Sequence, residues 1–391
     1  MKVRKNMIAI MALLCMGCVG CTKGQPKTDA GIESGLEDTG NTENEIESED
    51  TKSAADKQDF PDKFQETING VTFDTKIQIS EEAELGNLHQ ATATLQRPDI
   101  EKIKAVFAAG RTAVEERNET GSGEDGMEYP CYTAYYEDGA FLHTSMVLNY
   151  STPVFEKIYG AFRFRPDFEY NAVQYSKDTV LEIGDPEKIF DSVLKNINGA
   201  GYQLDSAAYD YYALDHETME KEYKMLDKSG EELSVDNISW GAGDDCYFYM
   251  AVQQHEGLPV YFGSSDFPED EESNRPVQVL YSANGIERLE VSQLYSFSEP
   301  GEPVSLLDFG RIAETVSKKY GDVIGTSYMV TRAELYKMPV KLADSTYDLK
   351  IVWLFEVIES GTDSDTGRDY EYTQYMFVDA TDGTEVFSDF R

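Results

Sequence analysis

Basic side chains are scarce in this chain. Its 391 residues include 34 Lys and Arg against 73 Asp and Glu, which gives a formal net charge of −39 at pH 7. Binding to nucleic acid depends on clustered Lys and Arg that contact phosphates, so this composition excludes a nucleic-acid partner. The same deficit argues against docking of the protein surface on anionic lipid. We interpret the acidity as a means of keeping an exported domain soluble.

Cysteine is also rare, and three of the five cysteines lie within the first 21 residues. Beyond that segment the chain has only Cys131 and Cys246. In an oxidising exterior these two could form a disulfide that joins the two halves of the chain, provided that their Cα atoms lie within about 7 Å. The alternative is a pair of buried free thiols.

Histidine is too scattered to predict a metal site. None of the four lies at i, i+4 from another ligand, whereas zinc needs three or four converging donors; the residues are His89, His143, His216 and His255. The sequence also lacks a Gly-x-Ser-x-Gly elbow and a dinucleotide-binding glycine loop. The least random ionisable pairs are His255-Glu256 and Asp244-Asp245, and solvated charge is the simpler interpretation of both. We therefore predict no catalytic residue, no cofactor and no enzymatic activity.

No hydrophobic run is long enough to span a bilayer, which takes roughly 20 residues. The longest early run, Met7–Leu14, follows a short basic start and precedes small residues and cysteines. That order is typical of a secretory signal, here residues 1–21. Its end resembles the lipobox of bacterial lipoproteins, which implies a lipidated Cys21, with Cys18 as the alternative; neither has Leu three residues upstream. An ordinary cleaved signal is the remaining interpretation.

Residues 22–59 lack an apolar face. They are rich in Gly, Ser, Thr, Asn, Asp and Glu, so little apolar burial is available to offset the entropy of ordering them. We predict a disordered acidic linker between the lipid anchor and the folded part, at the extracytoplasmic face of the cell membrane. Such a spacer reaches on the order of 35 Å.

From about residue 60 the pattern alternates between strands and helices. Val71–Ile79 alternates apolar and polar residues after Asn69-Gly70, which predicts a hairpin with a type I′ turn. Helices are predicted after Asp99 and after Asp185-Pro186, where an aspartate can cap the first turn. The aromatic stretch Val154–Ser176 is expected to be rich in strands.

The predicted fold class is α+β, with antiparallel sheets each packed against one or two helices. We expect two or three tandem modules after the linker: an N-terminal module over 60–180 and a C-terminal region over 181–391. The end of that region is the most legible part, because Ser305–Tyr320 forms an amphipathic helix pattern and three strand patterns follow it.

Three stretches carry a resemblance near the end of the chain, namely Thr331–Tyr336, Leu349–Phe355 and Phe377–Gly383. With them, residues 302–391 resemble the PepSY-type extracytoplasmic modules. In its layout the region 60–391 resembles an uncharacterised family of Firmicutes lipoproteins, domain of unknown function 6034. The resemblance implies an exported α+β protein without known chemistry.

One weak metal candidate remains. Asp363, Asp365 and Asp369 place carboxylates around a glycine, and calcium prefers several such oxygen ligands. The spacing departs from an EF-hand loop, which would need Gly at position 368 and an acid at position 374. A polar hairpin tip is the alternative.

Together these features predict a membrane-anchored extracytoplasmic lipoprotein that acts as a non-catalytic binding, sensing or regulatory module. Its expected partners are the membrane, through the lipid anchor, and an envelope protein or peptide. The alternatives are an envelope hydrolase or processing factor, and a cell-surface substrate-binding lipoprotein.

Overall fold

The computed structural model describes most of the chain from Phe60 onward, within one compact unit, Ala54–Arg391. The described residues are 60–97, 99–122, 128–162, 168–223, 225–226, 232–233, 238–263, 275–321, 326–342, 346–364 and 366–387. The predicted signal peptide, both candidate lipidation sites and the predicted linker lie outside them. Asp365 of the calcium candidate lies outside them as well.

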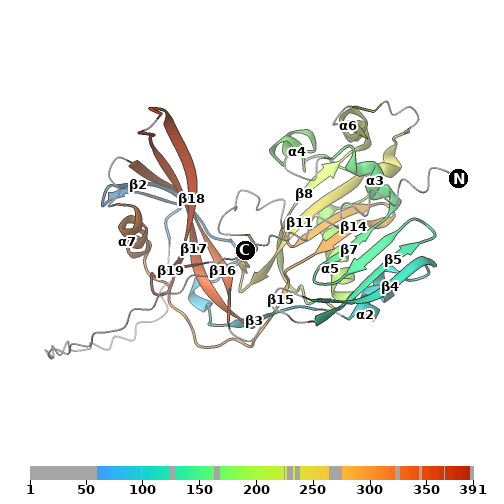
Figure 1. Ribbon diagram of the computed structural model, residues 1–391, viewed down its shortest axis with the longest axis horizontal. Helices are drawn as coiled ribbons and strands as arrows, with labels where there is room; N and C mark the ends of the chain where they lie inside the picture. The colour runs from blue at the N-terminus through green and yellow to red at the C-terminus, as the bar shows by residue number, and fades with distance from the viewer. Residues whose placement is uncertain are drawn as a thin grey trace, which may run out of the picture. The chain divides into compact units, whose positions relative to one another are not determined.

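The fold is α+β, as predicted, and two large sheets organise it (Figure 1). The first sheet has eight strands, in which β2 and β16 pair in parallel and the other neighbours run antiparallel. Its strands are β1 (Lys63–Ile68), β2 (Val71–Gln78), β3 (Thr92–Leu95), β15 (Tyr295–Phe297), β16 (Thr326–Lys341), β17 (Thr346–Thr362), β18 (Asp369–Asp379) and β19 (Glu385–Val386). They follow the order β1-β2-β16-β17-β18-β19, and β3 lies between β15 and β17.

The second sheet has nine antiparallel strands. They are β4 (Ala113–Ser122), β5 (Glu128–Tyr136), β6 (Phe141–Thr144), β7 (Leu148–Ser151), β8 (Ala207–Leu214), β11 (Cys246–His255), β12 (Leu258–Pro259), β13 (Val277–Ser282) and β14 (Gly285–Val291). The order is β12-β11-β13-β14-β7-β6-β5-β4, with β8 beside β11. A separate pair, β9 (Met225–Leu226) and β10 (Glu232–Leu233), is antiparallel.

Six helices accompany the sheets in the described part of the chain: α2 (Ile100–Phe107), α3 (Pro153–Tyr159), α4 (Phe168–Gln174), α5 (Pro186–Gly199), α6 (His216–Glu222) and α7 (Phe309–Tyr320). Two short 3-10 turns are η2 (Leu85–Asn87) and η3 (Ala242–Asp244). The predicted caps are confirmed, because Asp99 and Asp185 each accept a backbone hydrogen bond from the first turn of α2 and α5. Helix α7 packs its apolar face on the first sheet, against Trp353 and Phe355 (Figure 1).

Strand β11 is buried on both faces. Tyr247 and Tyr249 share a core with α2 and α5, whereas Cys246, Phe248 and Met250 face a second core that includes residues of α3 and α6. The two tyrosine hydroxyls donate to the carbonyls of Gly184 and Pro186. Helices therefore cover both faces of this strand, whereas many antiparallel sheets keep one face in water.

The Asn69-Gly70 hairpin is confirmed, with positive φ at both residues. The strand-rich expectation for Val154–Ser176 is wrong, because α3 and α4 occupy much of that stretch. Thr152 caps α3 by accepting from the Val154 amide, and Pro153 fits its first turn. This helix start outweighed the strand propensity of the aromatic residues.

The sheets do not follow the expected boundary between 180 and 181. The nine-stranded sheet spans 113–291 and therefore crosses it, whereas the eight-stranded sheet combines residues 63–95 with residues 295–386. The N-terminal hairpin pairs with the C-terminal strands through β2 and β16, for example at Phe73 and Val330. The chain enters the second sheet after β3 and leaves it before β15, and these two strands pair with Leu95 opposite Tyr295.

Candidate ligand-binding pocket

The two cysteines considered for a disulfide, Cys131 and Cys246, are free in the structure, which agrees with the alternative of unpaired thiols. Cys131 lies in β5 and Cys246 in β11, and β13, β14, β7 and β6 lie between these strands. At about 4.8 Å a strand, this order separates the two Cα atoms by roughly 24 Å, far beyond the reach of a disulfide. Burial raises the pKa of both thiols, so neither is activated as a nucleophile.

The described part of the calcium candidate forms a hairpin tip between β17 and β18. The Asp363 carboxylate accepts from the amide and hydroxyl of Thr366, and Gly367 has a positive φ. The Asp369 carboxylate accepts from the Thr362 hydroxyl. These two carboxylates thus serve the turn itself. Among the residues that the structure describes, no group of three or more His, Cys, Asp or Glu could hold a metal ion.

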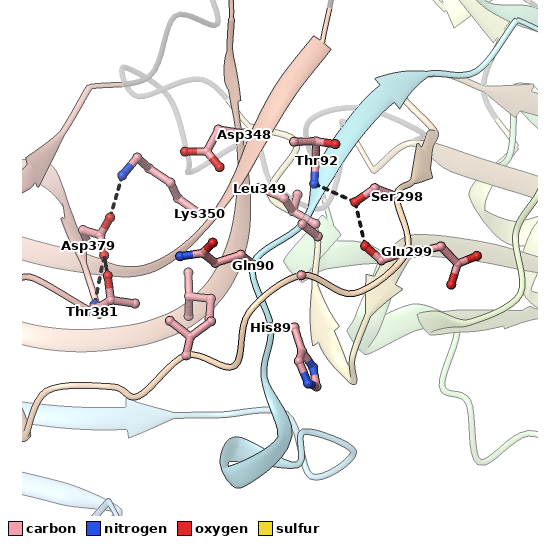
Figure 2. A pocket seen from close by; sticks show the side chains of 14 residues that line it. His89, Gln90, Thr92, Ser298, Glu299, Asp348, Leu349, Lys350, Asp379 and Thr381 are labelled. Carbon is pink, nitrogen blue, oxygen red and sulfur yellow. Dashed lines mark hydrogen bonds and ion pairs between the residues drawn. The ribbon is translucent and has the colours of Figure 1, made fainter.

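A pocket of about 450 Å³ opens on the first sheet, where β15, β3 and β17 lie side by side (Figure 2). Its size falls within the usual range of ligand pockets, roughly 300–1,000 Å³. Four separate segments supply its lining: His89, Gln90, Ala91, Thr92, Ser298, Glu299, Gly301, Val304, Asp348, Leu349, Lys350, Ile351, Asp379 and Thr381.

Strand β17 presents alternate side chains to the two faces of the sheet. Leu349 and Ile351 are buried in apolar clusters, so Asp348 and Lys350 share the opposite face. The sequence Tyr-Asp-Leu-Lys-Ile-Val therefore puts one carboxylate and one ammonium at the pocket from a single strand. Figure 2 shows both side chains extending from neighbouring positions of that strand.

The opposite wall is a loop, 298–304, that is fixed against the approach to β3. Backbone hydrogen bonds join Gln90 to Glu302 and Gly301, and Val304 to Leu88. The Thr92 amide donates to the Ser298 hydroxyl. Gly301 permits this approach, because a Cβ there would lie 2.9 Å from the Gln90 carbonyl oxygen. The wall is therefore held by backbone hydrogen bonds and by the Ser298 hydroxyl, which accepts from the Thr92 amide and donates to the Glu299 carbonyl.

One ion pair spans the pocket at the β18 end. Lys350 Nζ lies 2.7 Å from the Asp379 carboxylate, which also accepts from the amide and hydroxyl of Thr381. Burial acts to raise the pKa of Asp379, but these hydrogen bonds outweigh it and the pKa lies below its usual value. The bond to Asp379 raises the pKa of Lys350, and the charge of Asp348 adds to the effect. Both members of the pair are ionised near neutral pH.

Three other polar side chains of the lining form no ion pair or hydrogen bond with the described residues. Among the described residues, the Asp348 carboxylate, the Glu299 carboxylate and the Gln90 amide have no hydrogen-bond partner, and Figure 2 draws none for them. Gln90 and Glu299 are exposed and Asp348 is half-buried. The pocket therefore keeps hydrogen-bonding capacity that the fold does not use.

His89, at the pocket margin, is anchored by an ionic cluster, which we define as the half-buried His89 and Glu256 and the fully buried Lys337. The backbone amide and Nδ1 of His89 lie 3.1 Å and 2.9 Å from the Glu256 carboxylate. Lys337 Nζ donates to the His89 carbonyl at 3.0 Å and to Glu256 at 2.7 Å. Glu256 comes from the second sheet and Lys337 from the first, so the cluster ties the two sheets together.

Burial governs the electrostatics of this cluster. Lys337 is fully buried, and burial lowers the pKa of its ammonium even though Glu256 acts in the opposite sense. Burial acts to raise the pKa of Glu256, but the bonds from Lys337 and His89 outweigh it and lower the pKa. The neighbouring His255 packs on Phe297 at 4.4 Å between ring centroids. Burial, with the nearby Lys337 charge, lowers the pKa of His255 to about 4.

The turn that carries Glu256 depends on a glycine. Glu256 and Gly257 have φ of +52° and +75°, which fits a tight turn between β11 and β12. A Cβ on Gly257 would lie 2.1 Å from the carbonyl oxygen of Glu82. This position thus requires glycine for both its conformation and the close approach of the two backbones.

Asp244 and Asp245, the other ionisable pair noted in the sequence, form separate ion pairs with different partners. Asp244 lies 2.6 Å from Lys157 Nζ, and Asp245 lies 2.8 Å from His216 Nδ1. The bond to Asp245 raises the pKa of His216. Asp245 also accepts from the backbone amide of His216, in the first turn of α6. The interpretation as solvated charge is wrong for Asp245, which is buried, and for Glu256.

Sequence reasoning missed the pocket. Its segments are separated by up to about 290 residues in sequence, from His89 to Thr381, and only strand pairing brings them together. The one local signal is the alternation of Asp348 and Lys350 with buried apolar residues in β17.

The fold is shared with an uncharacterised protein from Eubacterium rectale, with a TM-score of 0.55, 14% identity and coverage of 84% of this chain and 94% of that one. At this identity the likeness shows the fold alone. The C-terminal domain of Bacillus megaterium YpeB aligns over 74% of this chain and 96% of that domain, with 10% identity and a TM-score of 0.25, too low to carry an argument. No family model and no curated protein matches the chain. The resemblances to PepSY modules and to domain of unknown function 6034 remain predictions.

No helix in the described ranges has the length and apolar character needed to cross a bilayer.

Proposed function

We propose that this protein is a lipid-anchored extracytoplasmic binding module, without catalysis of its own, that holds a segment of an envelope protein or peptide in the pocket of its first sheet. The observation that carries the proposal is the unused polar capacity of that pocket. Asp348, Glu299 and Gln90 lack hydrogen-bond partners among the described residues, whereas the nearby cluster of His89, Glu256 and Lys337 is consumed by internal bonds. Groups that the fold leaves free are available to a partner.

The location follows from the N-terminal sequence. A basic start, a short apolar run and terminal cysteines predict export and acylation at Cys21 or Cys18. Two acyl chains hold a protein on the bilayer without a basic surface, which suits the charge of −39.

A labelling experiment tests the anchor. Cells grown with radioactive palmitate should label the wild-type protein in the membrane fraction, and a Cys18→Ser, Cys21→Ser double variant should lose the label. A wild-type protein that stays unlabelled and cytosolic would contradict the proposed location.

Site-specific photo-crosslinking tests the binding. A benzoylphenylalanine in place of Glu299 should give a discrete crosslinked species in intact cells, and one in place of Glu371 serves as the matched control. Glu371 is also exposed on the first sheet, in β18, but does not line the pocket. The same products from both positions, or none from Glu299, would refute the pocket as the binding site.

A further inference from the structure

Strand β18 is paired on one side along its whole length and on the other side along only part of it. β17 pairs with all 11 residues of β18, Asp369–Asp379. On the opposite side, β19 pairs with Phe377 and Val378. Among the residues that the structure describes, no strand lies beside the segment Asp369–Thr373 on that side. The first sheet thus ends there in an open edge, which we call the β18 edge.

Hydrogen bonds at the end of β18 show which backbone groups face this edge. The Ala380 amide donates to the Ile351 carbonyl, toward β17, and the Asp379 amide donates to the Thr384 carbonyl, on the side of β19. In an antiparallel ladder these directions alternate from one residue to the next. The register between β17 and β18 has no shift. The backbone groups of the odd-numbered residues of β18 therefore point away from β17.

The backbone groups of Glu371 and Thr373 are available for pairing. Within the described ranges, no hydrogen bond reaches their outward-facing amides or carbonyls. Natural sheets often protect such an edge with a bulge or a proline. The edge strand β4 of the second sheet has a bulge between Ala113 and Glu115, whereas the segment Asp369–Thr373 keeps a regular register and contains no proline. The β18 edge therefore retains the geometry that accepts another strand.

The side chains of the β18 edge differ between its two faces. Alternate residues of a strand point to opposite faces of the sheet. Asp369 and Glu371 therefore share one face, and both are exposed. Tyr370 and Tyr372 share the other face, with ring centroids 5.2 Å apart, and Tyr372 is 62% exposed. A strand beside this edge meets carboxylates on one face and aromatic rings on the other.

We propose that the β18 edge binds an extended segment of a partner protein in which basic residues alternate with apolar residues. The segment adds an antiparallel strand to the first sheet and extends the ladder that β19 begins. Residues directly opposite each other in such a ladder have their side chains on the same face. The basic residues therefore lie on the face of Asp369 and Glu371, and the apolar residues pack on Tyr370 and Tyr372. None of these four residues lines the pocket, so this surface goes beyond the proposed function.

The charge of the edge distinguishes a basic partner from a second copy of the chain. Two copies joined through this edge would bring Asp369 and Glu371 of both chains along one seam, and like charges at facing positions are destabilising. The net charge of −39 adds to the repulsion between copies. The same charges attract a basic segment. The two carboxylates thus oppose self-association and select the partner.

Calorimetry on the full-length chain tests the proposal with matched peptides. The parent probe is a short acetylated and amidated peptide in which lysine and valine alternate. A residue opposite Glu371 has its side chain on the acidic face and its amide directed at β18, so the lysine amides form the ladder. N-methylation of the central lysine removes one donor and should weaken binding about tenfold. N-methylation of the adjacent valine, whose amide points away from β18, should leave the affinity unchanged.

Two variants locate the binding edge. Thr373→Pro removes an outward-facing amide without breaking a bond to β17, and Glu371→Lys reverses a charge of the acidic face. Each should weaken binding of the parent peptide about tenfold. Thr67→Pro is the matched control at the other end of the sheet. The Ile77 amide donates to the Asp62 carbonyl, so by the same alternation the Thr67 amide points away from β2. Thermal unfolding checks that each variant is folded at the temperature of the titration.

The outcomes separate strand pairing from general attraction to an acidic protein. The two methylated peptides carry the same charge, so equal affinities for them would overturn the proposal. A parent peptide that does not bind, or that binds Thr373→Pro as tightly as Thr67→Pro, would overturn it as well. A dimer in analytical ultracentrifugation that Thr373→Pro abolishes would identify a second copy as the occupant instead. In intact cells, benzoylphenylalanine at position 371 should capture the edge partner, and its product should differ from the product at Glu299.

Discussion

Two lysine–carboxylate pairs in this molecule have the same length and different surroundings. Lys337 and Glu256 lie 2.7 Å apart between the two sheets, and Lys350 and Asp379 lie 2.7 Å apart in the pocket. The Lys337 side chain is fully buried, and the Lys350 side chain is 31% exposed. Burial lowers the pKa of Lys337, whereas pairing raises the pKa of Lys350. Solvent access therefore decides whether such a pair holds the fold together or lines a site.

The largest effect should come from breaking the buried pair. Glu256→Gln removes the carboxylate and leaves the Lys337 ammonium buried without a counter-charge, which should cost about 3–5 kcal/mol of unfolding free energy. Urea unfolding measures it. A Glu256→Gln, Lys337→Met double variant removes both charges and should recover much of the loss. If the unfolding free energy of Glu256→Gln lies within about 1 kcal/mol of the wild type, the pair does not hold the sheets together.

The turn beside that pair should be nearly as sensitive. Gly257→Ala forces a Cβ against the Glu82 carbonyl at a residue with φ of +75°, and we expect a loss of about 2–3 kcal/mol. Gly285→Ala is the matched control, because Gly285 also has a positive φ but has open space at its Cβ position. Equal losses from the two substitutions would mean that the close approach of the backbones adds nothing.

The pH dependence of stability should reveal the burial of His255. Its folded pKa is about 4, against about 6.5 in an unfolded chain. Between about pH 6.5 and pH 4 the unfolded state therefore binds a proton on His255 that the folded state does not bind. The stability of the fold falls as the pH falls through this window. Between pH 7 and 5, His255→Phe should lose less stability than wild type, by on the order of 1 kcal/mol, as measured by urea unfolding.

His216 supplies a comparison of opposite sign. Asp245 raises the pKa of His216. The protonated histidine therefore stabilises the fold at low pH, and this stabilisation is lost as the pH rises through the folded pKa. His216→Asn should therefore lose more stability than wild type on acidification. The same trend in both variants would show that the environments of these histidines do not differ as described.

The pocket pair should be less sensitive than the buried pair. Lys350→Met removes a partly exposed ammonium but leaves the Asp379 carboxylate, whose side chain is only 4% exposed. Because Asp379 keeps its two bonds to Thr381, we expect a loss of about 1–3 kcal/mol of unfolding free energy. Urea unfolding measures it, and a loss as large as that of Glu256→Gln would show that the exposure of the lysine does not distinguish the two pairs.

The parts predicted correctly from the sequence are those set by local chemistry. Asn69-Gly70 can adopt a type I′ turn without help from distant residues, and Asp99 and Asp185 cap helices through bonds within their own first turns. Thr152-Pro153 carries an equally local helix-start signal, which the aromatic residues that follow it obscured.

The candidate site could not be predicted in the same way. Whether Asp348 has a partner depends on the segments that pair with β17, and the neighbouring β3 comes from more than 250 residues earlier in the chain. Glu256 was noted in the sequence, but nothing near it indicated that Lys337 would be its buried partner. Long-range pairing decides which charged residues are satisfied, and no local pattern encodes it.

The pairing of β3 with β15 has a practical consequence. Leu95 and Tyr295 face each other across this ladder, so the chain leaves the eight-stranded sheet and returns to it at adjacent points. A two-residue hairpin turn is enough to connect strand ends placed in this way. The nine-stranded region is thus inserted between two adjacent strand ends of the first sheet. A shortened chain that joins these ends could keep the β3–β15 ladder, but it would lose Glu256 and would need Lys337 replaced by an apolar residue.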